Sequence, residues 1–260
     1  MEKKIPALLY PEDQDFFSPE TLPYYCNTNE AFLQGEIRAF ALEFPGLGGG
    51  SCMGGDMALG VWCTPLSQKL GEKGILHAYL FPGPWSWMNK GAVRLANAVI
   101  CALKRKFNLA EDTPWLVMGG SMGGLGALTY CATSALTPNA CISLCPCVNV
   151  PDRFDVHPEF PRTYVRGVLE YDMPVAEALK QISPLHNVES LPKIPYHIMN
   201  DCADEIFPEA ELDGYVATLI GLGHDVSYSK LPGCPHGAIT PEEWETIYAF
   251  IFKHLLKKEN

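Results

Sequence analysis

The chain has 260 residues, a formal net charge of −11 and 47% hydrophobic residues. This length and apolar content predict one large domain, or one domain with an insertion. The acidic balance argues against nucleic acid and anionic membranes as partners, since both are negatively charged. No apolar run approaches the length that spans a bilayer, and the apolar stretch near the N-terminus is too short for a signal peptide.

After an irregular N-terminal arm over residues 1–36, strands and helices are expected to alternate through a domain over 37–260. Apolar runs predict strands at 38–44, 75–81, 115–118, 140–145, 194–199 and 225–231. Helices are predicted at 57–70, 89–107, 125–130, 208–222 and 241–257. Alternation with strands that are apolar throughout predicts an α/β fold, a mostly parallel sheet with helices on both faces.

Residues 148–183 interrupt this alternation. They contain four prolines and only scattered helix-like pieces between two predicted strands. In parallel sheets, sites form at the carboxyl ends of the strands. The segment is therefore predicted to be a small cap inserted over those ends.

The most informative motif is Gly119-Gly120-Ser121-Met122-Gly123-Gly124, between an apolar run and a predicted helix. The spacing Gly-x-Ser-x-Gly is that of a nucleophile elbow. Glycines on both sides of the serine let strand and helix pack closely around a strained turn. The motif predicts that Ser121 stands at a helix N-terminus as a nucleophile, whereas the alternative is an ordinary turn.

A serine nucleophile requires a base, usually a histidine that a carboxylate orients. Of the seven histidines, only His236 follows a predicted strand, between prolines and glycine and just before the last helix. Its position at a strand's carboxyl end predicts that it is the base. Asp201, Asp204 and Glu205 share the loop after the preceding strand, and spacing alone leaves the choice of acid open, because aspartate also stabilises turns.

Acyl transfer also needs N–H donors for the developing oxyanion. The N–H of Met122 follows the nucleophile directly. The glycine-rich loop over residues 45–50 offers a second donor at Leu47 or Gly48. The same loop lacks the third glycine of a dinucleotide-binding motif and the Gly-Lys-Ser/Thr of a phosphate loop.

Three aromatic residues are candidates for the substrate pocket: Trp85 and Trp87 after the second predicted strand, and Tyr164 in the cap. Large aromatic side chains serve equally well as packing. Arg162 and Arg166, near Tyr164, are more readily explained as surface ion pairs than as substrate contacts.

Ten cysteines lie mostly in apolar segments, which favours buried, reduced thiols and a cytoplasmic protein. Cys145 and Cys147 form a C-x-C pair without a second pair at zinc spacing. Neither a metal nor an organic cofactor is therefore expected.

Together these motifs resemble the α/β-hydrolase superfamily over roughly residues 38–257. The segments 183–185, 201–208 and 231–237 resemble the catalytic domain of prolyl-oligopeptidase-like proteins, and the loop over 45–51 resembles the oxyanion loop of small bacterial acetylesterases and feruloyl-esterase-like enzymes. The resemblance implies that Asp204 is the acid. The chain departs from the pattern at Pro45, where many members have histidine, and at Asn200-Asp201, where His-Gly is usual.

The expected function is a serine hydrolase that cleaves small carboxylic esters with Ser121, His236 and Asp204. A small peptidase or amidase, and a ligand-binding relative without activity, are the alternatives. The oligomeric state cannot be predicted from the sequence.

Overall fold

The computed structural model describes residues 10–47 and 60–256. Its seven-stranded sheet has the order β1-β3-β2-β4-β5-β6-β7. The strands are β1 (Cys26–Thr28), β2 (Ala39–Phe44), β3 (Ile75–Leu80), β4 (Trp115–Gly120), β5 (Ala140–Leu144), β6 (Pro195–Asp201) and β7 (Asp225–Leu231). The α-helices are α1 (Pro65–Glu72), α2 (Lys90–Lys106), α3 (Met122–Thr133), α4 (Phe160–Val168), α5 (Val175–Gln181), α6 (Glu209–Gly221) and α7 (Pro241–Leu255). Short 3₁₀ helices occupy Pro11–Asp13, Leu22–Tyr24, Glu30–Phe32, Pro151–Arg153 and Pro184–Ser190.

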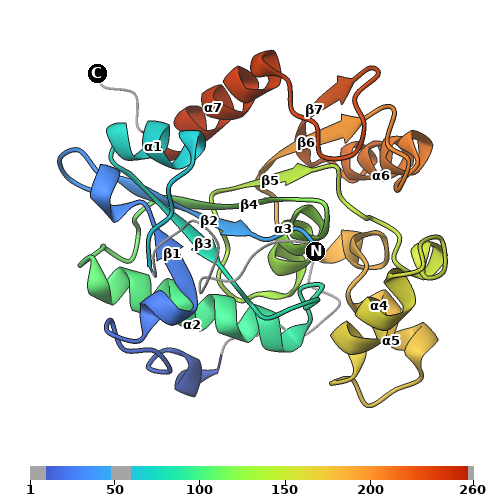
Figure 1. Cartoon of the computed structure of the whole chain (residues 1–260), viewed down its shortest axis with the longest axis horizontal. Coiled ribbons are helices and arrows are strands. Elements are labelled where there is room, and N and C mark those ends of the chain that lie inside the picture. The colour runs from blue at the N-terminus through green and yellow to red at the C-terminus, as the bar shows by residue number, and fades with distance from the viewer. Residues whose placement is uncertain (1–9, 48–59, 257–260) are drawn as a thin grey trace.

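The predicted mostly parallel sheet is confirmed. Strands β2 to β7 pair in parallel, and only β1 runs antiparallel, against β3. Helices α1 and α7 cover one face, and α2 and α3 lie on the other (Figure 1). Successive β2 residues alternate between two cores, with Phe40 and Leu42 facing α2 and α3 and Ala39 and Ala41 facing α1 and α7. This alternation explains why the strands read as continuous apolar runs.

The helix predicted over 57–70 differs from the structure. Residues 57–59 lie outside the described residues, and α1 begins only at Pro65. Thr64 fixes this start, because its side chain accepts a hydrogen bond from the N–H of Ser67 while the Ser67 hydroxyl accepts one from the N–H of Thr64. Such a capping box, with proline in the first turn, defines a helix N-terminus.

Strand β1 lies within the segment 1–36 that the sequence predicts to be irregular. Three residues give too little pattern to identify a strand, and tertiary contacts hold it in place. The buried side chain of Asn29 donates to the carbonyl of Ser67 at 2.7 Å and accepts from the N–H of His77 at 2.7 Å. The chain after β1 is thereby tied to both β3 and α1.

The segment 148–183 contains a 3₁₀ turn, α4 and α5, between β5 and β6. In Figure 1, α4 and α5 stand together at the lower right, outside the two layers that cover the sheet. The predicted interruption of the strand–helix alternation is therefore present. Its role as a cap over a substrate site stays a prediction.

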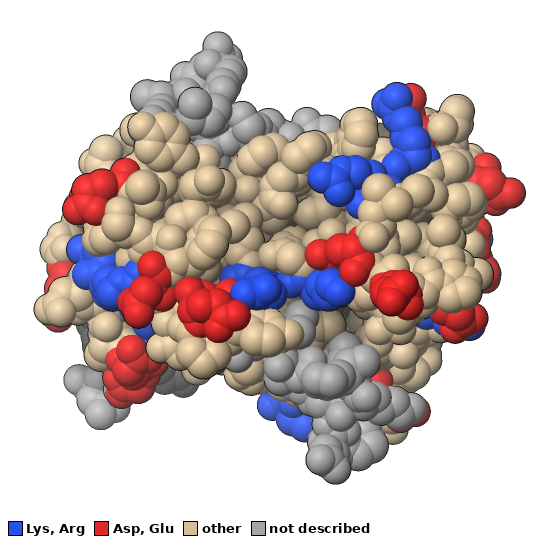
Figure 2. Space-filling model, turned by 90° about the horizontal axis from the view of Figure 1, so that it is seen from below, with Lys and Arg blue, Asp and Glu red and all other residues tan. Residues whose placement is uncertain are grey.

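The surface seen in Figure 2 carries lysine and arginine side chains next to aspartate and glutamate side chains. Pairs of this kind join α2 to the N-terminal segment, as between Arg94 and Asp13 at 2.7 Å and between Lys106 and Glu30 at 2.7 Å. None of the helices that the structure describes is both long and apolar enough to cross a membrane. Most of the cysteines in the described part of the chain are buried.

Candidate active site

Ser121 occupies the sharp turn between β4 and α3. Its backbone has φ 56° and ψ −120°, a conformation that costs energy for a residue with a Cβ atom. The turn is held by two hydrogen bonds, since the N–H of Ser121 donates to the carbonyl of Leu144 at 2.9 Å and its carbonyl accepts from Leu125 at 3.0 Å. The structure therefore forms the predicted elbow, with Ser121 at the N-terminus of α3.

Two glycines of the motif are required because their surroundings leave no room for a Cβ atom. A Cβ atom on Gly119 would lie 2.5 Å from the carbonyl carbon of Gly123, and one on Gly123 would lie 2.2 Å from the carbonyl oxygen of Phe44. A Cβ atom on Gly120 would meet nothing closer than 3.9 Å. Strand and helix can therefore cross this closely only when positions 119 and 123 lack side chains.

We expect Gly119→Ala to lower the free energy of unfolding by about 1–3 kcal/mol, because backbone atoms at 2.5 Å must move apart. Gly120→Ala is the matched control and should leave stability unchanged or raise it by less than about 1 kcal/mol. Urea denaturation followed by tryptophan fluorescence measures both variants. Equal stabilities for the two variants would contradict the close packing of the elbow.

His236 lies in the loop after β7, and its Nε2 is 2.9 Å from the Oγ of Ser121. Its Nδ1 is 2.6 Å from Oδ2 of Asp204, in the loop after β6. The other carboxylate oxygen of Asp204 accepts the N–H groups of Ile206 at 2.7 Å and Phe207 at 2.9 Å. Serine, imidazole and carboxylate thus form one continuous hydrogen-bonded chain.

The surroundings favour an ionised Asp204. Only 2% of its side-chain surface is exposed, and this burial alone would raise the carboxyl pKa. Hydrogen bonds from His236 and from the N–H groups of Phe207 and Ile206 outweigh burial, so the pKa is lower than usual. A carboxylate that stays charged can fix one tautomer of the imidazole and stabilise its protonated form.

Asp201, the alternative acid, has a different set of contacts. It is fully buried, and its Oδ2 accepts the N–H of Gly237 at 2.7 Å. Burial raises the pKa of this carboxyl, although the Gly237 hydrogen bond opposes the shift. Asp201 therefore holds the backbone of the loop that carries His236, whereas Asp204 contacts the imidazole itself.

Among the described residues, one group of metal-ligand type occurs here. Atoms of Cys145, Asp201 and His236 lie within 4.8 Å of one another. Both ring nitrogens of His236 are already hydrogen-bonded, to Asp204 and Ser121. Burial also raises the pKa of the Cys145 thiol to about 12, which disfavours the thiolate that binds metals.

The predicted oxyanion donors are only partly within the described residues. Met122 is the first residue of α3, where backbone N–H groups have no acceptor inside the helix. A Cβ atom on Gly46 would lie 4.0 Å from the Cβ of Ser121, so the loop that contains Leu47 passes beside the serine. Gly48 lies outside the described residues.

The predicted pocket residues Trp87 and Tyr164 pack against each other with ring centroids 4.1 Å apart and ring planes tilted by 35°, and both are almost fully buried. Trp85 is less buried, and the guanidinium of Arg162 lies 5.1 Å from its ring. Trp85 and Trp87 have φ values of 55° and 47°, so the loop before α2 is strained. Their contact with a substrate stays a prediction.

Phe207, which the sequence reasoning missed, contacts His236 directly. Its ring packs edge-on against the imidazole at 5.3 Å and stacks with Phe160 of α4 at 6.1 Å. Phe160 in turn packs against Trp87 at 6.0 Å. An aromatic wall therefore joins the loop before α2, the segment 148–183 and the acid loop. Its only sequence signal is that Phe207 follows Asp204 by three residues.

Known structures resemble this chain in fold. No family model matches it, and no curated protein matches it in sequence. The uncomplexed Pyrococcus horikoshii acylaminoacyl peptidase superimposes with a TM-score of 0.66 and 18% identity, over 88% of this chain and 39% of its own. The chain thus spans about two fifths of that peptidase.

Two esterases match over most of both chains. The propionate-bound Est2 esterase of Thermogutta terrifontis has a TM-score of 0.61 and 16% identity, over 90% of each chain. Esterase B from Lactobacillus rhamnosis has a TM-score of 0.63 and 11% identity, over 92% of this chain and 86% of its own. With the sheet order, the elbow and the positions of His236 and Asp204, these matches show that the chain has the α/β-hydrolase fold.

Proposed function

We propose that this protein is a serine hydrolase that cleaves carboxylic esters of small molecules through an acyl-enzyme on Ser121. The observation that carries the proposal is the continuous hydrogen-bonded chain from Ser121 through His236 to Asp204, with distances of 2.9 and 2.6 Å. This is the arrangement in which a weakly nucleophilic hydroxyl has a base in place to remove its proton.

In the first half-reaction, Ser121 Oγ attacks the ester carbonyl carbon while Nε2 of His236 takes the hydroxyl proton. The carbonyl oxygen becomes an oxyanion beside the free N–H of Met122, where the partial positive charge at the N-terminus of α3 also favours it. A second donor, from Leu47 or Gly48, is part of the proposal. The tetrahedral intermediate then expels the alcohol, which receives its proton from His236.

In the second half-reaction, a water molecule attacks the acyl carbon and gives a proton to His236. Collapse of this second intermediate releases the carboxylic acid and returns the proton to Ser121 Oγ. Asp204 holds the imidazole in the tautomer that presents Nε2 to the serine and stabilises the imidazolium formed in both steps. No cofactor is needed for this cycle.

The same residues would also cleave an amide, so an amidase or peptidase is the second candidate. The resemblance to acylaminoacyl peptidase favours it. The match to Est2 covers 90% of both chains, however, whereas the match to the peptidase leaves about three fifths of that protein uncovered. This difference in coverage favours ester hydrolysis over amide hydrolysis as the function.

The test is a hydrolysis panel of short and aromatic acyl esters with matched aminoacyl amides, beside labelling with a fluorophosphonate. We expect ester turnover and one label, which mass spectrometry of peptides locates on Ser121. Faster turnover of the amides would establish the peptidase reading. Absence of labelling on the folded protein would support the ligand-binding alternative and contradict the proposal.

A further inference from the structure

A cavity separate from the candidate active site lies between α1 and α7, on the face of the sheet opposite α2 and α3. A cavity of about 510 Å³ opens there, a size typical of small-molecule sites. Its walls combine three aromatic rings with three charged groups, namely Trp62, Trp244, Tyr248, Glu43, Lys69 and Glu245. None of these residues takes part in the proposed hydrolysis.

The cavity already holds one ammonium group of the chain itself. Nζ of Lys69 lies 3.5 Å from the ring centroid of Tyr248 and 2.9 Å from Oε1 of Glu245. An aromatic face and a carboxylate together form a favourable environment for a cation. Lys69 thus shows that an ammonium group can lie between a ring and a carboxylate at this cavity, although the side chain of Glu245 is 72% exposed.

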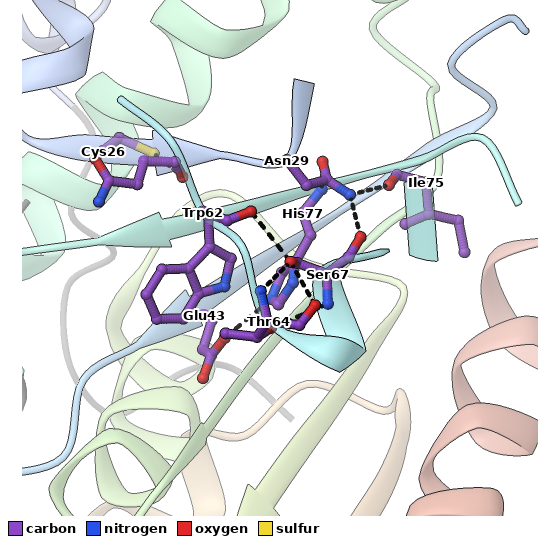
Figure 3. Close-up of polar contacts among 9 residues, drawn as sticks. Cys26, Asn29, Glu43, Trp62, Thr64, Ser67, Ile75 and His77 are labelled. Atoms are coloured by element: carbon purple, nitrogen blue, oxygen red, sulfur yellow. Dashed lines mark hydrogen bonds and ion pairs between the residues drawn. The ribbon is translucent and has the colours of Figure 1, made fainter. Parts of the chain in front are cut away.

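Glu43 provides a second carboxylate without such a cation. About a quarter of its side-chain surface is exposed, and its ion-pair partner is His77, whose Nε2 lies 3.0 Å from Oε2. Figure 3 shows the side chains of Glu43 and His77 close to the indole of Trp62, with Glu43 below it and His77 beside it. Within residues 10–47 and 60–256, no lysine or arginine forms an ion pair with Glu43.

His77 faces Glu43 from inside the sheet and is completely buried. Its Nε2 lies 3.0 Å from Oε2 of Glu43, yet neither ring nitrogen of His77 has a hydrogen-bond partner of good geometry among the described residues. The Glu43 carboxylate lines the cavity and is partly exposed, so it can still accept hydrogen bonds from a ligand. The lining thus brings two carboxylates, Glu43 and Glu245, together with one ammonium group, that of Lys69.

From these observations we infer that the cavity between α1 and α7 binds a small organic ammonium ion with an apolar body. The ammonium group would form an ion pair with Glu43, as Lys69 does with Glu245. The apolar body would lie among the rings of Trp62 and Trp244. A neutral ligand of the same shape gains the ring contacts and lacks the interaction with Glu43, so charge is the feature that the site recognises.

The test is isothermal titration calorimetry of the full chain at pH 7 with benzylamine, which is protonated there, and with benzyl alcohol as its neutral counterpart. We expect one benzylamine per chain and much weaker binding of the alcohol. Glu43→Gln keeps the shape and removes the charge, and it should weaken benzylamine binding by about tenfold or more. Glu242→Gln, on the exposed first turn of α7 and outside the cavity lining, is the matched control and should bind as the wild type does.

Lys69→Met gives a prediction of opposite sign. It removes the competing ammonium from the same cavity, so benzylamine should bind more tightly than to the wild type. Trp244→Leu, on the half-exposed side of α7, leaves the contact between Glu43 and His77 in place and should weaken binding. This variant keeps the test valid if Glu43→Gln fails to fold.

Three results would overturn the inference: equal affinities for benzylamine and benzyl alcohol, unchanged binding by a folded Glu43→Gln protein, or weaker binding by Lys69→Met. The site must also be separate from Ser121. Ser121→Ala should therefore bind benzylamine as the wild type does, and loss of binding in that variant would place the amine at the candidate active site instead.

Discussion

Ser121→Ala is expected to lower kcat/KM for any ester that the wild type hydrolyses by at least about 10⁴-fold. The variant loses only Oγ, whose one side-chain hydrogen bond within residues 10–47 and 60–256 is the contact with Nε2 of His236 at 2.9 Å. Without the nucleophile no acyl-enzyme forms. The oxyanion donors then retain only a residual enhancement of the hydrolysis rate over the uncatalysed reaction in water. Steady-state kinetics on the best ester of the panel measures the effect.

Loss of folding cannot explain such a result if stability is measured beside activity. Alanine at position 121 retains the strained backbone with φ 56°, so its free energy of unfolding should stay within about 1 kcal/mol of the wild type. Ser229→Ala, on the edge strand β7, is the control and should keep full activity. Equal rates for Ser121→Ala and the wild type would rule out Ser121 as the nucleophile.

The elbow could be predicted from the sequence because local geometry alone demands it. Positions 119 and 123 must lack Cβ atoms where strand and helix cross, so the requirement is visible in the sequence as two glycines. His236 could be inferred from topology, since the carboxyl ends of parallel strands meet at one edge of the sheet. Both inferences need only the order of the elements along the chain.

The choice between the acids required the path of a loop, which spacing does not determine. Asp201 and Asp204 are three residues apart, yet Asp201 turns to the N–H of Gly237 and Asp204 to the imidazole. The start of α1 and the existence of β1 were also missed. The start of α1 is set by the capping box between Thr64 and Ser67, whereas β1 depends on hydrogen bonds between residues distant in sequence, such as those of Asn29 to Ser67 and His77.

The aromatic wall and the second cavity depend on packing between distant segments. Phe207 meets His236 across 29 positions of sequence, and Glu43 meets His77 across neighbouring strands. His77 is completely buried in β3. The carboxylate that His77 faces could be recognised only once the register of β2 against β3 was known.

Asp204→Asn is expected to lower kcat by about 10³- to 10⁴-fold while the protein still folds. The amide that replaces the carboxylate offers no negative charge to the imidazolium, and its NH₂ group can turn the histidine to the wrong tautomer. The N–H groups of Ile206 and Phe207 can still donate to the remaining carbonyl oxygen, so the loop keeps its shape. Steady-state kinetics and circular dichroism together measure the two effects.

Asp201→Asn is the matched control, three residues away in the same loop. Its carbonyl oxygen can still accept the N–H of Gly237, so kcat should remain within about tenfold of the wild type. If the Asp201 variant loses activity and the Asp204 variant keeps it, the roles of the two acids must be exchanged.

The two carboxylates should also differ in how they affect stability as the pH changes, because their pKa values shift in opposite directions. The lowered pKa of Asp204 means that its ionised form stabilises the fold above the ordinary pKa of 3.8, and this contribution is lost as the pH falls through the lower folded value. The raised pKa of Asp201 means that ionisation opposes folding, so this unfavourable contribution to the free energy of unfolding disappears as the pH falls through the raised value.

At pH 7, Asp204→Asn should therefore be less stable than the wild type, and Asp201→Asn should be at least as stable. Urea denaturation at pH 7 and at pH 3 should show that both differences in the free energy of unfolding shrink on acidification. A ranking in the opposite order at pH 7 would mean that Asp204 is not held as a carboxylate beside His236, and the proposed role of Asp204 would fail with it.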